Sequence, residues 1–105
     1  MNRFQWATWA LAFLLAATSV ASAKRVTVTI EGLKYHPATV EVEAGDTVVW
    51  TNKDDREHTV TADDGSFDSG RMAKGKSYSR TFGTAGTFKY GSDPSPRTKG
   101  TVVVK

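Results

Sequence analysis

The sequence of 105 residues contains no cysteine. A chain without cysteine forms no disulfide, and it offers no attachment point for c-type haem or for the lipid of a lipoprotein. It also has no thiolate, the side chain that binds soft metal ions such as Cu(I). The stability of the protein must therefore come from one packed core, and thiolate metal chemistry is excluded.

Histidine and methionine are also scarce: there are two of each, His36 and His58, and Met1 and Met72. Charge of one sign does not dominate, because 14 basic residues face 11 acidic ones, for a net charge of +3. The two signs alternate without a run of about five or six like charges, which is typical of a solvated surface. The pattern predicts no nucleic-acid binding.

No apolar run reaches the length of about 20 residues that spans a bilayer. Residues 1–23 instead have the pattern of a cleaved secretory signal: Arg3 gives the positive start, residues 6–17 the apolar segment, and Ala21-Ser22-Ala23 the cleavage site. Cleavage would leave residues 24–105 as a single domain. We expect this domain to be periplasmic or secreted, without attachment to a membrane.

Short apolar alternations separated by turn residues fill the remaining sequence. Val26, Val28 and Ile30 alternate with threonines, and Thr47-Val48-Val49-Trp50-Thr51 gives the strongest strand signal. Similar patterns cover 39–43, 58–61, 77–82, 87–90 and the valines near the C-terminus, and no helical period interrupts them. The sequence predicts an all-β fold, an antiparallel Greek-key β-sandwich of six to eight strands.

The stretch 88–105 reads as a strand, a short stiff loop and a second strand. Tyr90, Pro94, Pro96 and Gly100 stand at the spacing of the ligand loop of the small blue copper proteins, the cupredoxins of the plastocyanin and amicyanin type. In that family the loop runs Tyr, any residue, Cys, two residues, His, Pro, any residue, Met, any residue, Gly. The sequence resembles this family in the frame of the loop.

The copper ligands of the family do not match. Ser92 stands at the position of the cysteine thiolate, Ser95 at that of the second histidine, and Thr98 at that of the axial methionine. The segment starting at His58 is similar to the one that carries the first copper histidine, so three of the four ligand positions are replaced. The resemblance implies the fold of the family, without its blue copper site.

The resemblance extends over nearly all of the sequence after residue 23. It includes the run Gly45 to Trp50, and it is carried further by these residues: Tyr35, Pro37, Val42, Asn52, Thr59, Val60, Phe67, Asp68, Ser69, Gly70, Gly75, Phe82, Gly86 and Phe88. The family role that it implies is that of a small copper-dependent electron carrier. This chain could fill that role only if other groups replaced the lost ligands.

Two other uses of the polar residues are open from the sequence. His58, His36 and Asp93 could form a weak site for Cu(II) or Zn(II), which accept imidazole and carboxylate ligands. Ser92 or Ser95 with His58 and Asp93 has the residue types of a serine hydrolase, but the sequence has no G-x-S-x-G elbow. We expect no catalytic activity.

The sequence thus predicts an exported protein with the cupredoxin fold, no cofactor and no enzyme activity. We expect it to act as a binding or structural module, as a monomer, with a protein partner whose identity is open. The alternatives are the family role of a periplasmic electron carrier and weak metal binding through His58 and His36.

Overall fold

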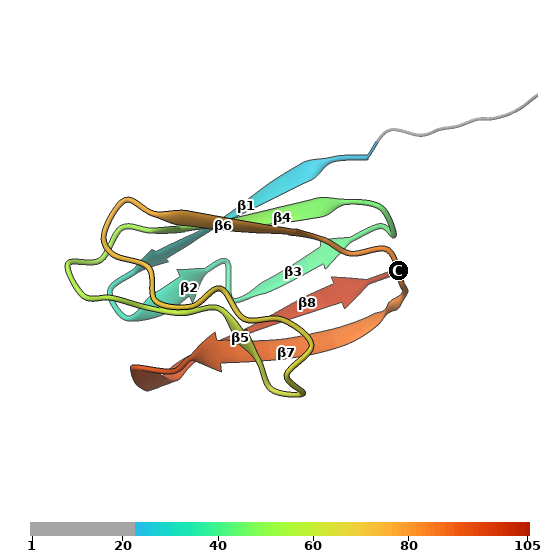
Figure 1. Ribbon diagram of the computed structural model, residues 1–105. Coiled ribbons are helices and arrows are strands. Elements are labelled where there is room, and N and C mark those ends of the chain that lie inside the picture. Colours follow the sequence, from blue (N-terminus) through green and yellow to red (C-terminus); the bar gives the residue numbers. More distant parts are fainter. Residues whose placement is uncertain (1–22) are drawn as a thin grey trace, which may run out of the picture.

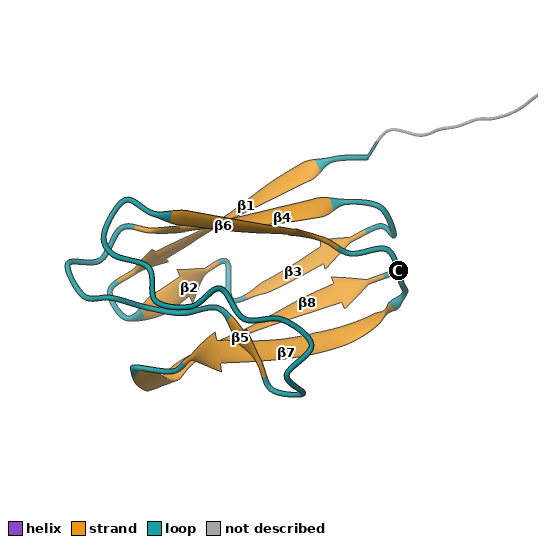
Figure 2. Cartoon of the chain, viewed as in Figure 1, coloured by secondary structure: helices purple, strands orange, loops and turns teal. Residues whose placement is uncertain are grey.

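The structure, a computed structural model, describes residues 23–105, and these form eight β-strands and no helix (Figures 1 and 2). The strands are β1 (Arg25–Glu31), β2 (Lys34–His36), β3 (Thr39–Val42), β4 (Thr47–Asn52), β5 (Thr61–Ala62), β6 (Ser77–Thr81), β7 (Gly86–Ser92) and β8 (Ser95–Val104). Their short length and alternating burial agree with the pattern of the sequence. The predicted signal segment, apart from Ala23, lies outside the described residues.

Two four-stranded sheets pack face to face, in the orders β2-β1-β4-β6 and β3-β8-β7-β5 (Figure 1). The predicted all-β sandwich is confirmed. The sheets are mixed, however, where only antiparallel pairs were expected, because β1 pairs with β4 and β3 pairs with β8 in parallel. β2 reverses the chain after β1, and β3 then crosses to the second sheet, so β4 enters the first sheet in the direction of β1.

Two segments differ from the expected strand pattern. The strand expected at 58–61 is reduced to β5, and His58 forms only an isolated bridge with Met72. The expected loop between the last two strands is a tight hairpin, in which Ser92 pairs with Ser95 after a register shift at Gly91. Asp93 and Pro94 alone make the turn. Ser92 and Ser95, which were expected in a loop, are therefore held by strand pairing.

The core lies between the sheets and is centred on Trp50. In β4 the residues Val48, Trp50 and Asn52 are buried, as strict alternation along a strand requires. The Trp50 ring contacts aromatic side chains from several other segments, with centroid distances of 5.4 to 6.4 Å, namely Phe67, Tyr78, Phe82 and Tyr90. This packing joins the two sheets, since Trp50 lies on β4 in the first sheet and Tyr90 on β7 in the second. No helix of residues 23–105 has the length and apolar character to cross a membrane.

Candidate functional site

Three segments meet at one end of the sandwich, on the left in Figure 1: the turn between β1 and β2, the segment 53–58 after β4, and the β7–β8 hairpin. Hydrogen bonds made by side chains, either with one another or with the backbone, connect all three. They involve Asp54, His58, Ser92 and Thr98, so the site contains both retained and replaced positions of the resemblance.

His58 is the centre of this network, and it is completely buried. Its Nε2 lies 2.8 Å from Asp54 Oδ2, and its Nδ1 lies 2.9 Å from Ser92 Oγ. An ionised carboxylate only accepts hydrogen bonds, so Nε2 carries a proton, and in the neutral ring Nδ1 accepts a hydrogen bond from the Ser92 hydroxyl. The backbone N–H of Thr59 donates to the same Ser92 oxygen at 3.3 Å. Both ring nitrogens are therefore used within the protein.

Asp54 connects His58 to the β1–β2 turn. Its carboxylate accepts hydrogen bonds from the backbone N–H groups of Gly32, at 2.7 Å, and Leu33, at 3.0 Å. Partial burial opposes ionisation, but these donors and His58 outweigh it, so the pKa of the Asp54 carboxyl lies below its usual range.

Residues 53–57 are all charged, a composition typical of a solvated segment, yet the side chain of Asp54 is only 14% exposed. The side chain of its neighbour Asp55 is 90% exposed, as this composition would suggest. The short i to i+4 separation of Asp54 and His58 was the one feature of the sequence that could have indicated their contact. The neighbouring charged residues gave no reason to single out Asp54.

The hydroxyl groups of Ser95 and Thr98 are hydrogen-bonded to each other on the hairpin. Their Oγ and Oγ1 atoms lie 2.8 Å apart, and the Thr98 hydroxyl donates to the carbonyl oxygen of Leu33 at 2.7 Å. Thr98 is buried. The hydroxyls at these two positions are thus engaged in hydrogen bonds, as is the one at Ser92.

The alternative metal site of His36, His58 and Asp93 is not assembled in the described chain. His36 lies exposed on β2 and its Nε2 donates to the carbonyl oxygen of Glu31 at 2.9 Å. Asp93 is exposed in the hairpin turn, where its backbone N–H donates to Thr59 Oγ1. Within residues 23–105 no three or more His, Cys, Asp or Glu side chains are grouped so that they could hold a metal ion.

The structure does connect a serine, a histidine and an aspartate, but the acid is Asp54 and not Asp93. His58 is fully buried and Ser92 is 3% exposed, so a substrate carbonyl has no approach to the Ser92 hydroxyl. The arrangement is a packed hydrogen-bond network, and its geometry gives no support to a hydrolase.

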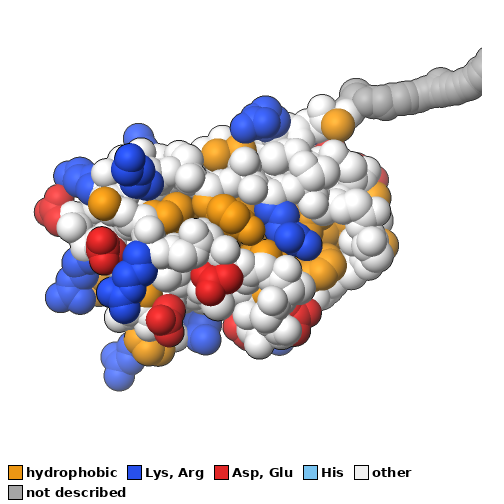
Figure 3. Space-filling view, in the orientation of Figure 1, with side chains coloured by type: hydrophobic (Ala, Val, Ile, Leu, Met, Phe, Trp, Pro, Cys, Tyr) orange, Lys and Arg blue, Asp and Glu red, His pale blue; other side chains and the backbone are white. Residues whose placement is uncertain are grey.

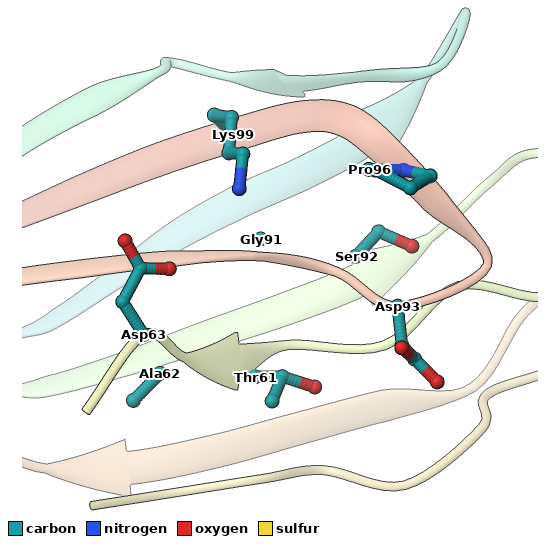
Figure 4. Close-up of a pocket in the computed structure, with 8 residues that line it drawn as sticks. All are labelled: Thr61, Ala62, Asp63, Gly91, Ser92, Asp93, Pro96 and Lys99. Atoms are coloured by element: carbon teal, nitrogen blue, oxygen red, sulfur yellow. The ribbon is translucent and has the colours of Figure 1, made fainter. Parts of the chain in front are cut away.

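A pocket of about 230 Å³ lies beside the hairpin, where β5 meets β7 and β8 (Figure 4). Asp63 and Lys99 reach toward one another across Gly91, and the Ser92 hydroxyl is turned away from both (Figure 4). The pocket therefore borders the backbone of the hairpin, while the Ser92 hydroxyl belongs to the network around His58.

The fold and the position of this site define a class of protein, a β-sandwich with a polar site under its last hairpin. The family model described as the cupredoxin-like domain matches residues 5–104. The chain belongs to the cupredoxin-like family.

Known members of the family are similar to this chain in sequence. Amicyanin of Paracoccus denitrificans is 35% identical over 95 residues, covering 86% of this chain and 72% of its own. Plastocyanin of Scenedesmus fuscus is 34% identical over 86 residues, covering 70% of this chain and 88% of its own.

Solved structures agree with the fold. A methionine-to-alanine mutant of amicyanin in its Cu(I) form has a TM-score of 0.72 at 36% identity, covering 82% of this chain and 86% of its own. A purple cupredoxin from Nitrosopumilus maritimus has the same TM-score at 26% identity, covering 76% of this chain and 99% of its own. The resemblance noted in the sequence therefore holds for the fold and for the family.

Proposed function

We propose that this chain is an exported cupredoxin-fold protein whose blue copper site is dismantled, and that it acts as a copper-free binding or structural module. In this proposal it transfers no electrons and catalyses no reaction. The observation that carries it is the hydrogen bond of 2.9 Å between His58 Nδ1 and Ser92 Oγ, since the resemblance in sequence assigns copper ligands of the family to these two positions. The same proposal places the chain in the periplasm or outside the cell, as a monomer.

The side chains at the four positions do not fit type 1 copper. Such a site needs two imidazoles and a thiolate in one plane, with a weak axial thioether. His58 supplies one imidazole, and the other three positions supply neutral hydroxyls, at Ser92, Ser95 and Thr98. A serine hydroxyl keeps its proton near neutral pH, so it replaces neither the charge nor the softness of a thiolate.

The geometry supports the same proposal. A nitrogen and a sulfur ligand on one tetrahedral or trigonal metal ion, at about 2.0 and 2.3 Å from it, are separated by roughly 3.5 Å. His58 Nδ1 and Ser92 Oγ are closer than this and share a proton. With Nε2 hydrogen-bonded to Asp54, Nδ1 has the lone pair that a metal ion would need, and the Ser92 hydroxyl occupies it.

A visible spectrum recorded during addition of Cu(II) tests the proposal. We expect no intense band near roughly 600 nm, because that transition requires a cysteine thiolate on copper. Any copper that binds should give only a pale colour, because no thiolate is present to supply the charge-transfer band. An intense blue band, or a reversible redox couple with one copper per chain, would contradict the proposal and favour the electron-carrier role.

A variant of the same chain gives the positive control. Ser92→Cys, Ser95→His and Thr98→Met together restore the family's groups around His58, while the prolines and the glycine that space the hairpin stay in place. We expect this triple variant to bind one copper, turn blue and cycle between its two oxidation states. Ser92→Cys alone should give at most a weak and easily oxidised complex, because one imidazole leaves the plane incomplete.

A folded triple variant that stays colourless would show that the hairpin does not bring these positions together around His58. In that case the absence of colour in the natural chain would say nothing about its residues.

A further inference from the structure

The pocket beside the hairpin has Gly91 as its floor. Thr61 of β5 pairs with Gly91 of β7, and Gly91 pairs with Lys99 of β8, so the three residues form one row across the sheet. An added Cβ on Gly91 would lie 3.2 Å from Lys99 Cδ and 3.1 Å from the carbonyl oxygen of Thr98. Glycine therefore leaves the space in which the Lys99 side chain lies and in which the hollow of about 230 Å³ forms.

Two opposite charges face each other across this floor without forming an ion pair. The Asp63 carboxylate and the Lys99 ammonium reach toward one another over Gly91 (Figure 4). Within residues 23–105 neither group has an oppositely charged partner within 4.0 Å. The Asp63 N–H donates to the carbonyl oxygen of Lys89 at 2.9 Å, and Lys99 is part of β8, so strand pairing holds both backbones in place. A gap is therefore kept between the two charges.

Other polar side chains at the pocket are engaged elsewhere or point away. The Thr61 hydroxyl donates to Asp68 Oδ1 at 3.1 Å. The Ser92 hydroxyl belongs to the buried network described above. Asp93 also lines the pocket, but its carboxylate points away from the gap (Figure 4). The facing charges of Asp63 and Lys99 are thus the groups that remain for a ligand.

The charges at the pocket favour a ligand that carries both signs. A simple anion that approaches Lys99 also meets the Asp63 carboxylate, and a simple cation that approaches Asp63 also meets the Lys99 ammonium, so each is both attracted and repelled. A zwitterion is attracted by both groups. On the face of the molecule that Figure 3 shows, acidic and basic side chains are interspersed, so a broad field of one sign does not override this local selection.

We propose that this pocket binds a small zwitterionic amino acid between Asp63 and Lys99. The carboxylate of the ligand accepts hydrogen bonds from the Lys99 ammonium, and the ammonium group of the ligand donates to the Asp63 carboxylate. Hydrogen bonds between ionised groups are the stronger kind, so two of them orient a small molecule. This inference rests on the proposed role as a binding module, and it names a class of ligand.

The size of the pocket limits the ligand. Its volume of about 230 Å³ lies below the roughly 300–1,000 Å³ of pockets for drug-sized ligands. It has room for a small amino acid such as alanine, with Pro96 as an apolar wall at the hairpin end (Figure 4). Asp63 and Lys99 are both exposed, so water competes for their charges, and we expect a Kd in the millimolar range.

The test titrates the metal-free protein with L-alanine and follows the backbone amides by NMR. We expect shifts that saturate and are confined to residues 61–63, 91–92 and 99. The affinity should fall with added salt, since charges at an exposed site are screened. Acetate and ethylammonium, which carry one charge each, should bind at least about fivefold more weakly than L-alanine, because each satisfies only one of the two facing groups.

Variants separate the site from the general charge of the surface. Lys99→Gln and Asp63→Asn should each weaken binding of L-alanine at least about fivefold, since each removes one charged partner. The matched controls Lys89→Gln and Asp64→Asn change neighbouring charges that do not line the pocket, and should change the affinity less than about twofold. Gly91→Ala should remove the saturable shifts, because its methyl group takes the floor of the hollow, and its melting temperature shows whether it is folded.

Shifts that do not saturate, equal losses in the charge variants and their controls, or acetate binding as tightly as L-alanine would overturn the inference. Its failure is separate from that of the proposed function. A chain that shows no blue copper band but does not bind L-alanine lacks only this ligand site, whereas a blue band refutes the copper-free role whatever the amino acid does.

Discussion

The middle of the sandwich and the end under the last hairpin are held together by different forces. In the middle, Trp50 packs among aromatic rings and valines, and its neighbours are almost all apolar. At the end, hydrogen bonds join hydroxyls, a carboxylate and the His58 imidazole. Apolar packing depends on volume and shape, while the polar network depends on which donors and acceptors face one another.

This difference shows how a family fold can be kept independently of the side chains at one end of the sandwich. The frame of the site is set by packing between the sheets and by strand pairing, and neither uses the side chains of Ser92, Ser95 or Thr98. Fold and chemistry therefore depend on separate sets of residues, and one can change while the other stays.

The largest effect on stability should come from a substitution in the middle of the sandwich. Trp50→Ala removes a fully buried side chain that contacts four aromatic rings, so we expect a loss of about 3–5 kcal/mol in the free energy of unfolding. Urea unfolding followed by circular dichroism measures it. Thr87→Ala, at an exposed position of β7, is the matched control and should change stability by about 0.5 kcal/mol or less.

A Trp50→Ala protein as stable as the natural one would mean that the core does not centre on this residue. The statement that apolar packing around Trp50 holds the middle of the sandwich together would then be wrong.

A smaller loss is expected at the polar end. Asp54→Ala leaves His58 Nε2 and two backbone N–H groups without their acceptor, which should cost about 1–3 kcal/mol. Asp55→Ala removes an exposed ion pair with Lys74 and should cost less than about 1 kcal/mol. Equal losses in the two variants would show that the network contributes no more than an ordinary surface contact.

The same carboxylate predicts how stability depends on pH. The pKa of Asp54 is lower in the folded protein than the value of about 3.9 for an unfolded chain. The folded state then binds fewer protons, so its contribution is complete above a pH of about 5 and is lost as the pH falls through the folded pKa. Melting temperatures should drop over this acidic range, and the drop should be smaller in Asp54→Asn.

The alternation of valines and aromatics was sufficient to predict the sandwich, because a half-buried strand needs that period wherever it lies in the fold. The parallel pairs could not be predicted, since the direction in which β4 enters its sheet depends on where β2 and β3 cross over.

At the site, the spacing of Tyr90, Pro94, Pro96 and Gly100 identified the hairpin. The role of Asp54 could not be predicted, because it depends on contacts with the β1–β2 turn. Gly32 and Leu33, which bind the Asp54 carboxylate, precede it in the sequence by 22 and 21 positions. Nothing in the sequence pattern indicates that Leu33, in the β1–β2 turn, is exposed and has a φ of +62°. Exposure and a positive φ are properties of the folded turn, and leucine is not a residue from which a left-handed conformation is expected.

The smallest effect concerns metal ions and stability. A ligand that binds only the folded state stabilises it by about 2.7 kcal/mol when present at a hundredfold excess over its Kd. In a domain of this size, that would raise the melting temperature by roughly 10 °C or more. We expect Cu(II) or a chelator to move the melting temperature of the natural chain by less than about 1 °C, because the available donors offer no tight site. The triple variant should show the large rise in melting temperature with Cu(II) and lose it with the chelator.

A clear rise in the melting temperature of the natural chain that disappears in His58→Gln would contradict this expectation. It would mean that His58 leaves Ser92 and Asp54 to bind copper. The polar end would then be a metal site whose hydrogen bonds form only when the metal is absent.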